Sequence, residues 1–159
     1  MINNVLDEID MGILNLLQKD SRIFHKDIAI KMHKSITAIH TRIRRMEAEG
    51  YIKRYTVIVD HKKINRGLIA YTHVTIKKHS QQHLSAFQAE VLKLKEVLEC
   101  CHMTGKFDFL LRIAIRDMDE YNEVLMTKLS SLPHVGKMQS FFVMSETKNE
   151  TAYLIEPVK

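Results

Sequence analysis

The chain has 159 residues, of which 45% are hydrophobic and 27% charged, and its formal net charge is +5. This length allows one domain or two small ones, and the hydrophobic fraction is sufficient to build a core. Adjacent Cys100 and Cys101 are a poor framework for structural disulfides, and neither a signal peptide nor an apolar run of about 20 residues is found. These features exclude a disulfide-stapled protein and a membrane-spanning one. We therefore expect a reduced, cytoplasmic protein without a membrane partner.

The first third of the chain predicts three helices. Asp7 is a suitable N-cap for the first helix, which we expect to end at residues 19–21. A shorter helix is expected from about His25 to His33, and Ser35 is suited to cap a third. Two short helices joined by a tight turn and supported by a preceding helix make a helix-turn-helix pattern. The apolar stripe of the first helix consists of Ile9, Ile13, Leu16 and Leu17.

The third helix, Ser35 to Gly50, is amphipathic in a way that suits the major groove of DNA. Its apolar face repeats at helical spacing, and the opposite face carries hydroxyl, imidazole and guanidinium groups. The major groove admits one α-helix, and such side chains read base edges. The alternative is an ordinary helix with a solvated basic face. The apolar face consists of Ile36, Ile39, Ile43 and Met46, and the polar face of Thr37, His40, Thr41, Arg44 and Arg45, with Arg42 at its edge.

Positive charge is concentrated in and just after this helix, where nine basic residues between Lys31 and Lys63 face three acidic ones. A basic segment of this kind indicates a polyanionic partner. We expect the amino-terminal half of the helix to contact bases, through Thr37, His40 and Thr41. Arg44 and Arg45 are expected to contact phosphates or bases, and Lys53 and Arg54 to contact phosphates. Ser35 and Arg42 are also predicted DNA-binding residues, although Arg42 has a competing structural role, an ion pair with an acidic residue of the first helix such as Asp10.

After Gly50 the pattern becomes extended. Residues 51–60 are rich in β-branched and aromatic side chains, which predicts either a wing or a strand leading to a second domain. Residues 60–67 have the composition of a polar hinge. We therefore predict a DNA-binding domain at 1–51, a strand and hinge linker at 52–67 and a second domain at 68–159.

The second domain has a β-α-β-β-α-β pattern, typical of the ferredoxin-like fold, so the predicted class is α+β. Alternation predicts strands at 68–76, 98–103, 109–115 and 135–144, and helical spacing covers residues 84–94 and 121–132. Residues 151–155 are a further candidate edge strand. A small sheet covered on one face leaves the other apolar, with Tyr71, Phe141 and Phe142 as candidates for that face, and this favours dimerisation through the sheet.

The ordered set of motifs over both parts resembles the leucine-responsive regulatory protein/AsnC (Lrp/AsnC) family of transcriptional regulators. The resemblance runs from about Leu6 to Ile155. In the first domain it rests on Leu17-Gln18-Lys19-Asp20-Ser21-Arg22-Ile23, Arg42-Ile43-Arg44-Arg45-Met46-Glu47 and Gly50-Tyr51-Ile52. In the second it rests on Val97-Leu98-Glu99-Cys100, Thr104-Gly105-Lys106-Phe107-Asp108-Phe109 and Leu132-Pro133-His134-Val135.

The resemblance implies a regulator that binds double-stranded DNA sequence-specifically through a winged-helix-like helix-turn-helix domain. It implies homodimers that assemble further into tetramers or octamers, and an amino acid or related metabolite as effector at a subunit interface. The alternative is an architectural DNA-organising protein, or an amino-acid sensor, with little sequence specificity. By position, the effector residues are Thr104, Gly105, Lys106, Phe107 and Asp108 in one loop, and Gly136, Met138 and Ser140 on a strand.

The chain departs from the family pattern at two places. The helix-turn-helix turn reads His33-Lys34-Ser35 where the family has Gly-Leu-Ser, which puts the backbone geometry of the turn in question. Met138 stands where a small hydroxyl residue is common, so that wall of the effector site is bulkier. For Asp108 two roles remain open: pairing with an α-ammonium group, or capping the turn at Gly105.

Other chemistries fit the sequence less well. Neighbouring Cys100 and Cys101 on a strand point to opposite faces and do not chelate one ion together, so we expect no metal. No catalytic residues are predicted, since no nucleophile-base set, phosphate-binding glycine loop or carboxylate pair gathers at one site. An enzyme is therefore the disfavoured class, and no cofactor is expected besides the amino-acid effector.

Overall fold

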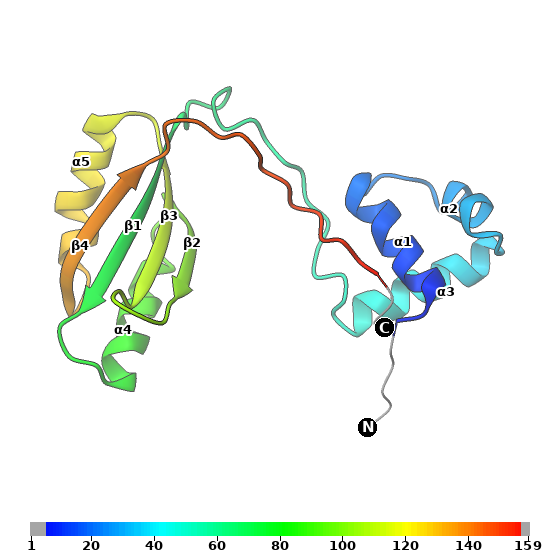
Figure 1. Ribbon diagram of the computed structural model, residues 1–159, viewed down its shortest axis with the longest axis horizontal. Coiled ribbons are helices and arrows are strands. Elements are labelled where there is room, and N and C mark those ends of the chain that lie inside the picture. The colour runs from blue at the N-terminus through cyan, green and yellow to red at the C-terminus, as the bar shows by residue number, and fades with distance from the viewer. Residues whose placement is uncertain (1–5, 157–159) are drawn as a thin grey trace. The chain divides into compact units, whose positions relative to one another are not determined.

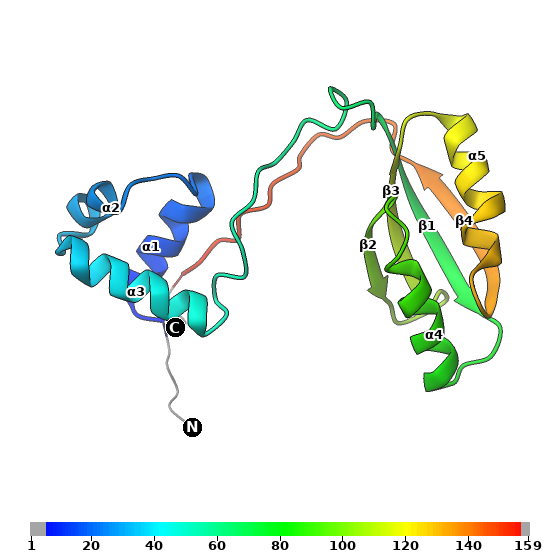
Figure 2. The same cartoon turned by 180° about the vertical axis from the view of Figure 1, so that it is seen from behind.

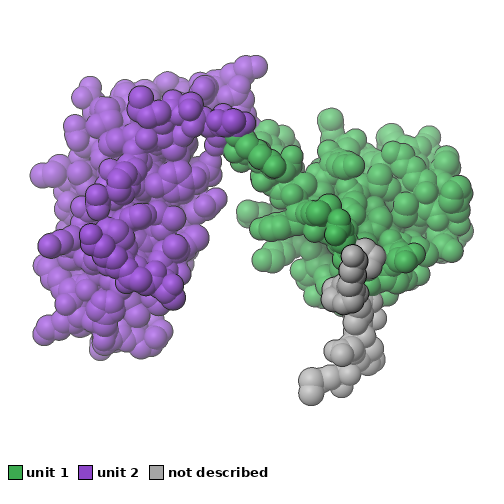
Figure 3. Space-filling model, viewed as in Figure 1, with its two compact units in different colours: residues 1–58, 148–159 green, residues 59–147 purple. Residues whose placement is uncertain are grey.

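The structure, a computed structural model, describes residues 6–156 and divides into two compact units (Figures 1 and 3). One unit contains residues 1–58 together with 148–159, and the other contains residues 59–147. The sequence prediction assigned the whole of 68–159 to the second domain. The structure instead groups the carboxyl-terminal segment with the helical unit at the start of the chain.

The first unit is built from three helices, α1 (Glu8–Lys19), α2 (His25–Met32) and α3 (Ile36–Ala48). The side chain of Asp7 accepts a hydrogen bond from the N–H of Asp10, and Asp10 returns one to the N–H of Asp7, so α1 begins with a capping box. The three helices enclose one small apolar core, largely as their periodicity predicted, except that Ile36 is 55% exposed and Leu14, which was not assigned to the stripe of the first helix, is buried. Its buried members are Ile13, Leu14, Ile28, Ala29, Ile39, Ile43 and Met46.

The turn between α2 and α3 keeps the left-handed geometry that the loss of glycine had put in question. His33 occupies this position with φ 51° and ψ 46°. The N–H of Lys34 donates to the carbonyl of Ala29, and the N–H of His33 donates to that of Ile30, which closes the end of α2. Histidine is among the residues that enter this region more readily than most. The turn is therefore formed at a backbone cost of about 1–2 kcal/mol that a glycine would avoid.

The second unit is a four-stranded antiparallel sheet with strand order β2-β3-β1-β4 (Figure 1). The α+β prediction, a helix-turn-helix followed by a ferredoxin-like β-α-β-β-α-β unit, is confirmed. Its strands are β1 (Leu68–Ile76), β2 (Val97–His102), β3 (Phe109–Ile115) and β4 (Val135–Phe142). Its helices are α4 (Gln81–Val91) and α5 (Met118–Thr127), the latter followed by a short 3-10 turn at Leu129–Ser131.

Both helices cover the same face of the sheet (Figure 2). On this face Phe87 of α4 packs 4.6 Å, centre to centre, from Phe109 of β3, and Tyr121 of α5 meets Phe142 of β4 edge-on. The prediction that Phe142 lies on the open face is therefore wrong. Adjacent strand residues point to opposite faces, so Phe141 and Phe142 cannot share one. Tyr71 and Phe141, which are paired across β1 and β4, are exposed on the open face of the sheet.

Two further expectations are corrected. Residues 151–155 form no edge strand but lie along α1, where the side-chain amide of Gln18 pairs with both the N–H and the carbonyl of Tyr153. Asn15 donates to the carbonyl of Ile155, whose side chain packs against the helical core. Residues 53–60 form neither a wing nor a strand, because their backbone joins no sheet. The β-branched and aromatic residues of the linker favour an extended backbone, but extended backbone alone does not make a strand, which needs hydrogen bonds to a neighbouring strand.

Candidate functional site

Helix α3 begins and ends as its sequence predicted. The Ser35 hydroxyl oxygen accepts a hydrogen bond from the N–H of Ala38 at 3.2 Å, which satisfies one of the free amides of the first turn. After Ala48 the chain leaves the helix through Gly50, whose φ of +79° favours glycine. Ser35 thus has a structural role at the start of the helix that carries the predicted DNA contacts.

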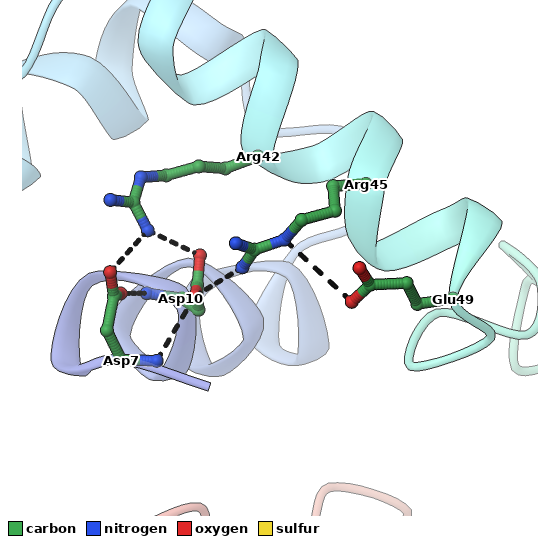
Figure 4. Close-up of polar contacts among 5 residues, drawn as sticks. All are labelled: Asp7, Asp10, Arg42, Arg45 and Glu49. Carbon is green, nitrogen blue, oxygen red and sulfur yellow. Dashed lines mark hydrogen bonds and ion pairs between the residues drawn. The ribbon is translucent and has the colours of Figure 1, made fainter. Parts of the chain in front are cut away.

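Two of the three arginines of α3 are turned toward α1 (Figure 4). Arg42 Nη1 lies 2.6 Å from Asp7 Oδ2 and 2.7 Å from Asp10 Oδ1, as the competing structural role for Arg42 predicted. Arg45 Nη2 lies 2.5 Å from the other Asp10 oxygen, and its Nε is 3.8 Å from Glu49. The side chain of Asp10 is 1% exposed, against 26% for Arg42 and 34% for Arg45. One buried carboxylate therefore fixes α3 on α1 through two guanidinium groups.

The ionisation of this cluster follows from these contacts. Burial acts to raise the pKa of Asp7, but the hydrogen bond from the Asp10 N–H and the Arg42 guanidinium outweigh it and hold the pKa below its usual value. Hydrogen bonds to Asp10 and Asp7 raise the pKa of Arg42. The Asp7-x-x-Asp10 spacing is itself a sequence signal for the capping box, although Arg45 as a second partner of Asp10 was not predicted.

Arg44 differs from its neighbours. Its side chain is exposed, and it makes no ion pair or hydrogen bond with any residue in the described part of the chain. Thr37 and Thr41 are exposed on the same side of the helix, and the Thr41 hydroxyl donates to the carbonyl of Thr37 at 3.0 Å. This face therefore presents a free guanidinium and two threonines, the groups that contact phosphates and base edges.

His40 is less exposed than predicted, because its ring faces a hollow of about 270 Å³ beside α3. We call this the His25–His40 hollow, since the His25 ring of α2 lies 5.6 Å from that of His40, centre to centre. Arg44 and Glu47 of α3 also line it, and Tyr55 of the linker completes its wall. The hollow and the roles of His25 and Tyr55 were not predicted, because no local pattern marks them.

Tyr55 connects the linker to α3. Its hydroxyl donates to Glu47 Oε1 at 2.8 Å. Burial, followed by the hydrogen bond and charge of Glu47, raises the pKa of Tyr55 to about 12, so the phenol stays protonated. Lys53 and Arg54, the two residues that precede Tyr55, are exposed and lie in the extended segment. The linker thus brings two cations close to the end of α3.

In the second unit, the predicted effector loop and the start of β4 lie at the same end of the sheet. Thr104, Gly105 and Lys106 are exposed in the loop between β2 and β3, and Gly105 has φ +107°. The neighbouring end of β1, residues 74–76, separates this loop from Val135 and Gly136. A Cβ at Gly136 would lie 2.8 Å from the Thr75 hydroxyl, so β1 and β4 approach closely here.

Asp108 is buried and already holds two partners. Its Oδ2 accepts from the N–H of Ile76 at 2.6 Å, and its Oδ1 lies 3.3 Å from His79 Nε2. Its carboxylate therefore joins the loop to β1 and does not cap the turn at Gly105. Phe107 lies beside it on the open face of the sheet, 4.5 Å, centre to centre, from the His73 ring. An effector ammonium would have to share the Asp108 carboxylate with His79.

Met138 and Ser140 face the helices rather than solvent. Met138 packs against the core of the second unit. The Ser140 hydroxyl is hydrogen-bonded to Tyr121 and, at 3.0 Å, to Thr72, and both of these residues are buried. The structure thus brings the loop and Gly136 to one end of the sheet, while Ser140 lies further along β4 in a buried hydroxyl cluster.

The described residues, 6–156, offer neither a metal site nor a membrane span. No group of three or more histidine, cysteine, aspartate or glutamate side chains there is placed to hold a metal ion. None of the described helices is both long and apolar enough to cross a bilayer.

Family comparisons match both units. Residues 6–53 match a family model described as winged helix-turn-helix DNA-binding, and residues 69–153 match the Lrp/AsnC ligand binding domain. The leucine-responsive regulatory protein of Salmonella typhimurium is 34% identical over 151 residues, which cover 95% of this chain and 92% of that protein. The protein of the same name from Escherichia coli K12 is 33% identical over the same coverage.

Solved structures agree with these matches. A transcriptional regulator from Neisseria meningitidis, in complex with L-Met, superposes with a TM-score of 0.89 at 29% identity, covering 94% of this chain and 97% of that one. An AsnC family transcriptional regulator from Agrobacterium tumefaciens has a TM-score of 0.88 at 30% identity, with the same coverage.

Proposed function

Because this chain belongs to the Lrp/AsnC family of transcriptional regulators, with its helix-turn-helix DNA-binding domain and its ligand-binding domain, we propose how it carries out that function. Helix α3 enters the major groove of double-stranded DNA, and an amino acid bound to the second unit modulates the binding. The protein acts in the cytoplasm, where its DNA partner lies, as a homodimer or a higher homo-oligomer and without enzymatic activity. The alternative of an architectural DNA organiser differs in having little sequence preference.

One observation carries the DNA-contact proposal, the division of labour among the arginines of α3. Arg42 and Arg45 are held by Asp10, whereas Arg44 is unpaired among the described residues and projects beside Thr37 and Thr41. We assign Thr37 and Thr41 to base edges and Arg44 to a base or phosphate. Lys53 and Arg54 contact phosphates, and Ser35, Arg42 and Arg45 position the helix.

The effector assignment rests on the sheet end that carries the 104–108 loop and Gly136. Exposed Gly105 and Lys106 can supply an N–H group and a cation to a carboxylate, and Asp108 can supply an anion to an ammonium. The complex of the Neisseria regulator with L-Met makes methionine the first amino acid to test. Met138 and Ser140 support this site from the core side.

The decisive experiment selects bound fragments from a genomic library, with and without L-Met. A sequence-specific regulator enriches a few fragments, and L-Met changes their recovery, whereas an architectural protein enriches fragments broadly.

For an enriched fragment, Arg44→Ala should raise the Kd about tenfold or more, since one contact to a charged group is worth roughly 1.5–3 kcal/mol. Arg116→Ala, which removes one positive charge from the second unit, is the matched control and should leave the Kd nearly unchanged. Equal Kd values for the two variants would refute the assignment of α3.

A further inference from the structure

The His25–His40 hollow is not explained by base recognition. His40 and His25 make no hydrogen bond with another residue in the part of the chain that the structure describes, and their rings face each other at 5.6 Å, tilted by 50°. Both are half-buried, and the hollow between them is open to solvent at the edge of α3. Two neighbouring imidazoles that lack partners are well placed to share a ligand.

The charges around the hollow indicate the kind of ligand. Besides the two histidines, the ionisable groups that line it are Arg44, Glu47 and Tyr55. The Glu47 carboxylate accepts the Tyr55 hydroxyl at 2.8 Å, while Arg44 has no partner within residues 6–156. A ligand entering the hollow therefore meets one free guanidinium and two imidazole rings with N–H donors, while the Glu47 carboxylate, the one acidic group among the lining residues, is occupied by the Tyr55 hydroxyl. This donor set suits an anion with several acceptor oxygens.

The position of the hollow identifies the source of that anion. Arg44 belongs both to the rim of the hollow and to the exposed face of α3, one turn from Thr41. When a recognition helix lies in the major groove, the phosphates that border the groove pass along its flanks. A flank that carries His40 and Arg44, with His25 from the preceding helix, is where a backbone phosphate would lie.

We propose that the His25–His40 hollow binds a phosphate of the DNA backbone, held by the two imidazolium groups and Arg44. His40 is then a phosphate contact that sets the register of α3, and not a reader of bases. The site makes DNA binding proton-linked: a bound phosphate favours the charged form of each imidazole, so binding takes up protons and affinity is lower at pH 8 than at pH 6. The proposal rests on the DNA-binding function assigned above.

The test measures binding of a mixed-sequence duplex by fluorescence anisotropy, at fixed salt, at pH 6 and at pH 8. The wild type should bind about tenfold more tightly at pH 6, and His25→Gln with His40→Gln should remove most of this difference. Each substitution should also lower the slope of log K against log salt by about 1 at pH 6. His102→Gln, an exposed histidine of the second unit, is the control and should behave as wild type.

A further variant, His25→Lys, distinguishes loss of the phosphate contact from loss of the fold. His25→Lys replaces the titratable group by a permanent cation and should retain tight binding at pH 8 with a smaller pH dependence than wild type. The proposal is overturned if the two glutamine variants keep the wild-type pH and salt dependence. It is also overturned if His40→Gln weakens binding to only one duplex sequence, because that marks a base contact. Loss of binding in Arg44→Ala together with wild-type behaviour of the histidine variants would leave the DNA-binding function intact and refute this site alone.

Discussion

At the scale of single residues, Asp10 organises the DNA-binding unit. Its carboxylate is buried, caps the first turn of α1 and binds the guanidinium groups of Arg42 and Arg45. Both arginines lie on the helix that carries the predicted DNA contacts, so this one carboxylate determines which cations of α3 remain available. Arg44 remains available because its position on the helical wheel is rotated by about 100° from that of Arg45, so its side chain projects away from α1.

The substitution Asp10→Asn tests this role. Asparagine keeps an oxygen for the capping box but removes the charge, so the two guanidinium groups lose their buried partner. We expect the free energy of unfolding of the helical unit to fall by about 1–3 kcal/mol, less than for a fully buried pair because both arginines reach solvent. Urea unfolding followed by helical circular dichroism measures the change. Glu8→Gln, on the exposed first turn of α1, is the matched control and should change stability by less than about 0.5 kcal/mol. If both variants unfold alike, Asp10 is not the organising residue.

At the scale of elements, the carboxyl-terminal segment acts as an additional element of the helical unit. It lies on α1, where Asn15 and Gln18, three residues apart and on one side of the helix, bind its main chain. Contacts of this type recognise an extended backbone, and Ile155 adds an apolar contact to the core. The segment therefore joins the first unit by a second route, separate from the linker that follows α3.

Removing the Gln18 side chain tests this attachment. In Gln18→Ala the N–H of Tyr153 loses its acceptor and the carbonyl of Tyr153 loses its donor. We expect the amide of Tyr153 to exchange with solvent about fivefold faster, because a local opening that costs about 1 kcal/mol less is correspondingly more populated. Native-state hydrogen exchange of the full chain measures this rate. Gln82→Ala, on the exposed start of α4, should leave it unchanged; an unaltered rate in Gln18→Ala would show that the segment is held by other contacts.

At the scale of the whole molecule, the sheet of the second unit exposes a face that its own helices leave open. Tyr71 and Phe141, directly opposite each other on β1 and β4, are 36% and 50% exposed, and the Phe107 ring lies on the same face beside His73. An aromatic patch of this kind indicates a protein interface. We expect a second copy of the chain to cover this patch, because a homodimer would match the two-fold symmetry proposed for the DNA site.

Phe141→Lys tests this interface. A lysine in the middle of the patch would have to be buried without a counter-charge, so we expect the oligomer to dissociate to smaller species. Sedimentation velocity at several concentrations measures the change in mass. Met126→Lys, at an exposed apolar residue of α5, is the control and should leave the mass unchanged. Dissociation in the control, or none in Phe141→Lys, would place the interface elsewhere.

Local patterns in the sequence were sufficient to predict the helices and the four strands of the sheet, although they also suggested a wing or strand at 51–60 and an edge strand at 151–155 that do not form. The capping residues Asp7 and Ser35, the helical spacing of Ile39, Ile43 and Met46, and the alternation of β3 each involve neighbours within one element, so chain order alone records them. The family resemblance extended this to the fold and the class of function. It also predicted effector residues in a loop and on a strand, of which the structure brings the loop and Gly136 to one end of the sheet, while Met138 and Ser140 face the core.

Only the tertiary structure decided the contacts between residues that are distant along the chain. It paired Arg45 with Asp10, turned Phe142 into the core, attached Asp108 to the N–H of Ile76 and laid Tyr153 on α1. It also placed His40 opposite His25, on the rim of a hollow. Periodicity states which face of a helix or strand is apolar, but not which distant group meets its polar edge, because that depends on how whole elements pack. The sequence therefore predicted α3 as the helix that contacts DNA, and the packing of α1 and α2 against it decided which of its cations are unpaired among the described residues.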